Sequence, residues 1–133
     1  MLAALVIVSC AACELQEQLD ALNLVNDTRT SAGLAPCAWD VDLQDRAQWW
    51  AEDLAARPRL EHSDLTTGVP RPWYRLGENV GYGPSIERIH VAYLDSPTHR
   101  ENVLNPVWTN CAVGVAHNGP YTFTVQLFLE PPG

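Results

Sequence analysis

The sequence predicts an α+β domain in which helices surround a small antiparallel sheet. Two amphipathic helical patterns occupy the first half of the chain. Near the C-terminus, apolar and polar residues alternate over 111–116 and 121–129 across His117-Asn118-Gly119-Pro120, which is a hairpin pattern. The 133 residues are 47% hydrophobic and 18% charged, a composition typical of one compact domain.

The first helix is predicted from about Glu14 to the turn formed by Gly33 and Pro36, because glycine ends helices and proline cannot continue one. Its apolar residues recur every three or four positions: Leu15, Leu19, Leu22 and Val25. A second helix is predicted after Asp40, whose carboxylate is a preferred N-cap, and it stops before Pro58. Its apolar stripe consists of Leu43, Ala47, Trp50 and Leu54.

The middle of the chain alternates between irregular and regular segments. Residues 58–76 show no periodicity and are predicted to form a loop, whereas the glycine-flanked segment 77–83 is predicted to be short and extended. Pro84 is predicted to open a third helix, since proline fits the first helical turn. Pro97 similarly opens a short fourth helix that ends near Asn105.

Residues 1–13 carry no charge and are apolar or small throughout. They are too few for a membrane span of roughly 20 residues, but they suit the apolar part of an export signal. Ile7-Val8-Ser9-Cys10 resembles a bacterial lipobox, and Cys13 is a second lipidation candidate. A cleaved signal peptide and a lipoprotein leader therefore remain alternatives. Both place the predicted domain, residues 14–133, outside the cytoplasm, either secreted or lipid-anchored at the cell surface.

Cys37 and Cys111 remain as an isolated pair once the two leader cysteines are set aside. In an oxidising compartment, such a pair in a small domain predicts a disulfide. A zinc site made of cysteine and histidine is the competing interpretation, but neither cysteine belongs to a C-x₂-C pair.

The formal net charge of −8 bears on the partners of the protein. It disfavours nucleic acid and anionic membrane surfaces, because both repel an acidic protein. We therefore expect no nucleic-acid partner and membrane contact only through a lipid anchor. Separately, we expect a monomeric domain.

Three separated residues, His62, Glu78 and His99, carry the groups most suited to a functional site. Imidazoles and a carboxylate can hold a borderline metal ion or move protons near neutral pH. The three are too far apart in sequence to share one helix face, so only the tertiary fold could bring them together. The other two histidines, His90 and His117, are predicted to be structural or solvated, with His117 in the hairpin turn.

Three motifs occur in a specific order: His62-Ser63, Gly77-Glu78-Asn79 and Ser96-Pro97-Thr98-His99-Arg100. Together with the closing hairpin, they resemble the CAP superfamily (cysteine-rich secretory, antigen 5 and pathogenesis-related-1 proteins; the SCP domain). The resemblance runs from about Leu22 to Phe128 and is closest to the small bacterial branch. It implies a three-layer α-β-α sandwich in which His62, Glu78 and His99 line one cleft.

The sequence departs from the family pattern at one site position. Many eukaryotic members have a further glutamate, and this position falls near Ser96, beside Asp95. Without that carboxylate, we expect no required cofactor and at most a weakly bound divalent cation such as Zn²⁺, held by His62, Glu78 and His99. Such binding would be lost as the histidines protonate below about pH 6.5.

Three interpretations of the site remain open: a hydrogen-bonded polar cluster, a metal site and a proton-transfer site. For hydrolysis, Ser63 and Ser96 are the nearby hydroxyls, but neither lies in a Gly-x-Ser-x-Gly elbow and no aspartate is placed to orient a histidine base. We therefore expect an exported protein that binds a small apolar ligand, a divalent cation, or an extracellular or cell-wall partner. The alternatives are a protease-like hydrolase and a non-catalytic extracellular scaffold.

Overall fold

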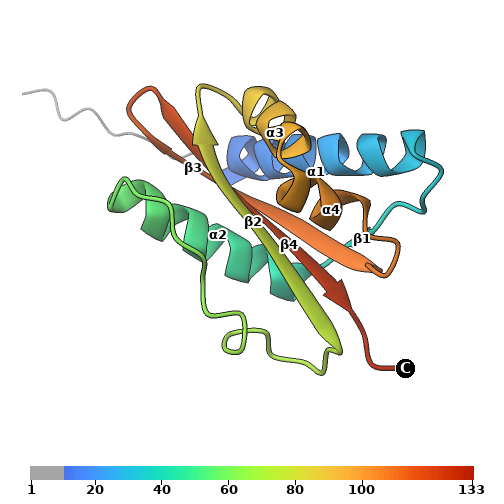
Figure 1. Ribbon diagram of the computed structural model, residues 1–133. Coiled ribbons are helices and arrows are strands. Elements are labelled where there is room, and N and C mark those ends of the chain that lie inside the picture. The colour runs from blue at the N-terminus through green and yellow to red at the C-terminus, as the bar shows by residue number, and fades with distance from the viewer. Residues whose placement is uncertain (1–10) are drawn as a thin grey trace, which may run out of the picture.

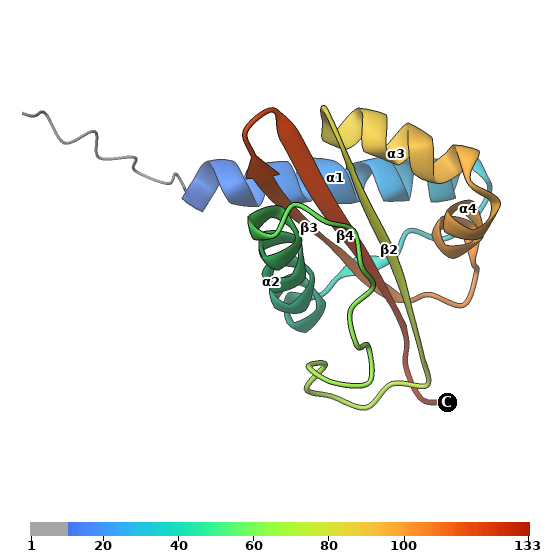
Figure 2. The same ribbon diagram turned by 60° about the vertical axis from the view of Figure 1, so that its left-hand side comes forward.

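The computed structural model describes residues 11–133 and forms three layers, with a four-stranded sheet between helices. Figures 1 and 2 show α2 on one face of the sheet and α1, α3 and α4 on the other. The elements are α1 (Ala11–Ser31), β1 (Ala38–Trp39), α2 (Val41–Ala56), β2 (Arg75–Gly83), α3 (Ile86–Asp95), α4 (Pro97–Leu104), β3 (Asn110–Asn118) and β4 (Tyr121–Glu130). The predicted α+β sandwich is confirmed.

Helix α1 begins at Ala11, three residues before the predicted start, and it ends where the sequence predicted. Gly33 adopts a φ of 80°, a left-handed conformation that costs glycine little. The N–H of Leu34 then bonds the carbonyl of Arg29 at 2.9 Å and the N–H of Gly33 bonds that of Thr30 at 3.0 Å, which is a Schellman cap. Cys13 lies exposed in the first turn of α1, and Cys10 lies outside the described residues.

Helix α2 has the predicted boundaries, with the Asp40 carboxylate accepting from the N–H of Leu43 at 3.1 Å. It packs closely on β3 because that strand presents small residues to it. A Cβ placed on Gly114 would overlap the carbonyl oxygen of Ala47, so the helix backbone occupies the space a side chain would need. The side-chain amides of Gln44 and Gln48 donate to backbone carbonyls of β3, in the part of that strand that β1 does not pair with.

The short helices α3 and α4 differ in how they begin. The predicted start of α3 at Pro84 is off by two residues, because the hydroxyl of Ser85 accepts from the N–H of Arg88 at 3.2 Å and acts as the N-cap. Helix α4 begins at Pro97 as predicted and ends at Leu104, before Asn105. None of the helices within residues 11–133 combines the length and apolar composition needed to cross a bilayer.

The sheet has the order β1-β3-β4-β2, with β3 antiparallel to β4, β4 antiparallel to β2, and β1 parallel to β3. The predicted hairpin is confirmed, but its turn is shorter than expected. His117 was predicted in that turn and instead lies on β3, paired with Thr122 of β4, where its Nε2 contacts Glu17 Oε2 at 2.8 Å. His90 is buried on α3, and its Nε2 lies 2.8 Å from the hydroxyl of Thr28 on α1.

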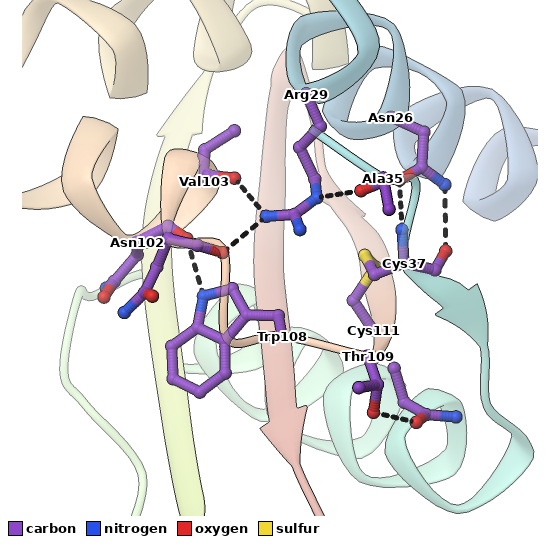
Figure 3. The surroundings of a disulfide bond; sticks show 11 residues. Asn26, Arg29, Ala35, Cys37, Asn102, Val103, Trp108, Thr109 and Cys111 are labelled. Carbon is purple, nitrogen blue, oxygen red and sulfur yellow. Dashed lines mark hydrogen bonds between the residues drawn. A yellow bond between two sulfur atoms is a disulfide. The ribbon is translucent and has the colours of Figure 1, made fainter. Parts of the chain in front are cut away.

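The predicted disulfide between Cys37 and Cys111 is present and buried, with 5.7 Å between the two Cα atoms. It ties the residue that precedes β1 to β3 beneath α1 (Figure 3). The side chain of Asn26 on α1 holds the same segment, accepting from the N–H of Cys37 at 2.9 Å and donating to its carbonyl at 3.1 Å.

Arg29 connects α1 to the end of α4 (Figure 3). Its guanidinium is buried and donates to the carbonyls of Ala35 at 3.1 Å, Val103 at 2.9 Å and Asn105 at 2.8 Å. Burial lowers the pKa of Arg29 from its ordinary value. Because α4 carries His99, this buried arginine helps to fix where the second site histidine lies.

Candidate functional site

Glu78 is the centre of a hydrogen-bonded cluster that joins β2 to the loop before it. Its side chain is 1% exposed, and Oε1 accepts from the backbone N–H of Ser63 at 2.9 Å and lies 2.7 Å from His62 Nδ1. Oε2 accepts from the Ser63 hydroxyl at 2.5 Å. Because an ionised carboxylate can only accept, His62 donates its Nδ1 proton to Glu78. In the tautomer that carries this proton, Nε2 is unprotonated, and the His62 side chain is 65% exposed.

Strand β2 aims the residues of the Gly77-Glu78-Asn79 motif to opposite faces. Glu78 lies on the side of α2, whereas Asn79 is fully buried on the side of α4. The amide of Asn79 donates to the carbonyl of His99 at 3.0 Å and to Gln126 Oε1 at 2.9 Å. Asn102 on α4 donates to Asn79 Oδ1 at 2.9 Å and to the carbonyl of Glu78 at 3.2 Å.

These amide contacts make Asn79 a framework residue of the site, a role that the sequence alone did not reveal. Its place next to Glu78 inside one motif was the available signal. Gly77 of the same motif is required for close approach, since a Cβ there would lie 2.8 Å from the indole of Trp108. The motif therefore fixes α4, and with it His99, against the edge strand that carries Glu78.

His99 lies in the first turn of α4, as predicted, and its nearest polar partner is Ser96. The Ser96 hydroxyl is 2.8 Å from His99 Nδ1, and the His99 ring packs against Tyr93 with 5.3 Å between ring centroids. The pKa of His99 is lowered from its ordinary value by burial and, second, by the positive charge that His62 acquires on protonation. The structure thus brings His62 into contact with Glu78 and places His99 within electrostatic range of His62, but it pairs His99 with Ser96.

The ligands available to a metal ion follow from these contacts. Both oxygens of Glu78 are engaged by donors from His62 and Ser63. Within residues 11–133, no group of three or more His, Cys, Asp or Glu side chains is arranged to hold a metal ion. Asp95, the neighbouring acid, is exposed at the end of α3. Glu78 could therefore ligate a cation only by releasing the donors of His62 and Ser63.

The cluster also contains an orienting carboxylate that the sequence alone did not reveal. Glu78 contacts His62 Nδ1 as an aspartate contacts the histidine base of a hydrolase, and this contact favours the tautomer with its proton on Nδ1. The two hydroxyls are engaged elsewhere: that of Ser63 donates to Glu78, and that of Ser96 lies against His99. The arrangement thus has an imidazole oriented by a carboxylate, and both candidate hydroxyls contact groups other than that imidazole.

A cavity of about 410 Å³ with aromatic walls lies near the C-terminal end of β2, the strand that carries Glu78. It is lined by Pro58, Arg59, Leu60, Tyr82, Tyr121 and Phe123. Tyr82 projects from the same face of β2 as Glu78, four residues further on, which places the two Cα atoms about 13 Å apart. Tyr82 packs on Phe123 with 5.8 Å between ring centroids while remaining 55% exposed. A small apolar group could occupy this cavity without entering the polar cluster.

Comparisons with known proteins agree with the fold and the motif order. The model of the family described as "CAP: Cysteine-rich secretory protein family" matches residues 22–128. The protein YkwD of Bacillus subtilis strain 168 is 29% identical over 107 residues, which are 74% of this chain and 42% of that protein.

Two solved structures share the architecture. An outer surface protein of Borrelia burgdorferi has a TM-score of 0.73 at 18% identity, covering 86% of this chain and 92% of that one. An extracellular protein containing a SCP domain from Bacillus anthracis strain Ames has a TM-score of 0.71 at 25% identity, covering 88% of this chain and 41% of that one. The chain thus spans less than half the length of YkwD and of the Bacillus anthracis protein.

Proposed function

Because the chain belongs to the CAP family of cysteine-rich secretory proteins, we propose that it is an exported binding protein whose His62 and His99 imidazoles contact the ligand. The buried disulfide fits an extracytoplasmic location, since such bonds persist in oxidising compartments. Export would rely on residues 1–13, by cleavage of a signal or by lipidation at Cys10 or Cys13. Mass spectrometry of natively expressed protein distinguishes these routes, and an intact Met1 terminus on cytoplasmic protein would contradict both.

The engagement of both nearby hydroxyls, that of Ser63 by Glu78 and that of Ser96 by His99, carries the proposal of binding rather than catalysis. A carboxylate that accepts from Ser63 and His62 at 2.5–2.9 Å serves to orient these groups. What it leaves accessible is His62 Nε2, near a second imidazole, that of His99, whose pKa is lowered chiefly by burial. Imidazole nitrogens can bind a divalent cation or hydrogen-bond a polar ligand group. The aromatic cavity along β2 could accept the apolar part of a small ligand.

The four histidines of the chain provide an internally controlled test with Zn²⁺ as the probe. The titration is followed by the NMR signals of the imidazole rings. At pH 7.5 the signals of His62 and His99 should shift together, with a weak affinity for Zn²⁺, and at pH 5.5 they should not shift. His90, which is buried, and His117, which is bound to Glu17, serve as controls. Shifts confined to His117, or calorimetry that is unchanged in a His62→Ala/His99→Ala variant, would exclude a cation at this site.

Ser96→Glu restores a carboxylate beside His99 and sharpens the same test. The Ser96 hydroxyl already lies 2.8 Å from the His99 ring, so a longer acidic side chain can reach a cation held by that imidazole. We expect Zn²⁺ binding to tighten by about tenfold, because a third protein ligand completes the usual set. If neither wild type nor this variant binds a divalent ion, the cation hypothesis fails and the polar-cluster interpretation stands.

A hydrolase is the second candidate, and the contact between Glu78 and His62 Nδ1 is the observation that favours it. An oriented imidazole with an unprotonated Nε2 can act as a general base toward water or a substrate hydroxyl. Purified protein should then cleave chromogenic ester or peptide substrates, with activity lost in His62→Gln and kept in His117→Gln. Equal residual activity in these two variants would assign it to a contaminant.

A further inference from the structure

The loop that carries His62 is attached to α2 on both sides of the histidine. Before it, the indole Nε1–H of Trp50 donates to the carbonyl of Glu61 at 2.9 Å. After it, the Nη2 of Arg46 donates to the carbonyl of Asp64 at 3.0 Å. Arg46 and Trp50 are four residues apart and therefore lie on one face of the helix. The segment between the two attachments is His62-Ser63, the pair that contacts Glu78.

Arg46 is enclosed by the loop that it holds. It is only 9% exposed, its guanidinium lies 4.7 Å from the ring centroid of Trp49, and Gly68 closes over it. Gly68 has a φ of 86°, and a Cβ at this position would lie 2.8 Å from Arg46 Nε. Asp64, at the attachment point, has a lowered pKa, chiefly because the Thr66 hydroxyl and N–H donate to its carboxylate. The loop from residue 64 to 68 is thus folded around one buried guanidinium.

We propose that Arg46 and Trp50 are positioning residues that set the direction of the His62 imidazole. Residues 57–74 form neither a helix nor a strand, so no backbone ladder keeps His62 in place. With its side chain 65% exposed, His62 is held mainly by its own bond to Glu78 and by the backbone around it. The two carbonyl contacts fix that backbone from the helix side, while the Glu78 contacts with Ser63 fix it from the strand side.

The consequence for the site is a single tautomer of His62. As long as the helix holds the carbonyls of Glu61 and Asp64, Nδ1–H faces Glu78 and Nε2 faces the ligand. Release of one carbonyl lets the loop shift, and a shift of about 1 Å is enough to break a hydrogen bond of 2.7 Å. The ligand part of this inference rests on the proposed function, whereas the tautomer part does not.

Arg46→Met and Arg46→Lys form a matched pair for the test. Methionine keeps an apolar stem without a donor, whereas lysine keeps a charged donor for the carbonyl of Asp64 on a stem one bond shorter. In ligand-free protein at pH 8, ¹⁵N imidazole spectra should show His62 with its proton on Nδ1 in wild type and Arg46→Lys, and mixed tautomers in Arg46→Met. Zn²⁺ affinity should fall about tenfold in Arg46→Met, as is usual when the support of a ligand is removed. Arg88→Met, on the exposed surface of α3, is the control.

The outcomes separate the positioning role from a general loss of stability. A folded Arg46→Met protein with the wild-type His62 spectrum overturns the proposal. If that variant does not fold, Trp50→Phe and Gly68→Ala perturb the same attachments from the helix and from the loop, and unchanged His62 spectra in both overturn it equally. If the tautomer changes as expected but no protein binds Zn²⁺, the positioning role stands and the cation hypothesis fails.

Discussion

Replacement of Glu78 tests whether the polar cluster holds the His62 loop on β2. The carboxylate is 1% exposed and accepts three hydrogen bonds, one from His62 and two from Ser63. Hydrogen bonds to charged groups contribute about 1.5–3 kcal/mol each when buried. Here His62 is mostly exposed and Ser63 is half-buried, so water replaces much of what either donor loses. We therefore assign about 1 kcal/mol to each contact.

Glu78→Ala should thus lower the free energy of unfolding by about 3 kcal/mol, and Glu78→Gln by about 1 kcal/mol. The glutamine keeps the size of the side chain and an acceptor for the N–H of Ser63, and its amide can donate to the Ser63 hydroxyl. Urea denaturation at pH 7, followed by circular dichroism, measures both free energies of unfolding. The dependence of the free energy of unfolding on urea concentration should be the same in the variants as in wild type. The expected shift in Tm is about 3 °C or more per kcal/mol for a domain of this size.

A double-mutant cycle with Ser63→Ala isolates the contact itself. Because the Ser63 hydroxyl and Glu78 Oε2 are 2.5 Å apart, the two substitutions should be non-additive, with a coupling of about 1 kcal/mol. Additive effects, or a Glu78→Ala variant within about 0.5 kcal/mol of wild type, would refute the argument that this carboxylate anchors the loop.

Three further variants probe the packing, the buried histidine and the disulfide elsewhere in the domain. Gly114→Ala should destabilise the domain by about 3 kcal/mol or more in a denaturant titration, because its Cβ would overlap a backbone oxygen of α2; near-wild-type stability would mean that the helix can move away. The pKa of His90 is lowered by burial, so the unfolded chain binds its proton first, and stability should fall as the pH drops below about 6.5. His90→Gln should flatten that decrease, and an unchanged pH profile would contradict the assignment. Removal of the disulfide by Cys37→Ala/Cys111→Ala should cost about 4 kcal/mol for a bond that spans 74 residues, and a loss below about 1 kcal/mol would show that the constraint on the unfolded chain is weak.

Local sequence signals located most elements of the fold, because the start and end of a helix or strand depend on residues only a few positions away in sequence. Asp40 caps α2 through its own side chain, and Gly33 ends α1 because glycine accepts a positive φ. The start of α3 was misplaced, because Pro84 and Ser85 both suit a helix start and only the bond from the N–H of Arg88 decides between them. Strand β1 was missed, since two residues, Ala38 and Trp39, are too few to show a period.

The sequence by itself determined which chemical groups the site contains and which family order they follow: two imidazoles, one carboxylate and the loop, strand and helix that carry them. Only the tertiary structure decided how these groups pair. Glu78 is oriented toward Ser63 and His62, His99 is paired with Ser96, and α2 holds the loop through Arg46. The physical reason is that hydrogen bonds act over about 3 Å, so their partners are set by the packing of segments distant in sequence. Helix caps and strand alternation depend on neighbouring residues, whereas a site assembled from loop, strand and helix depends on the whole fold.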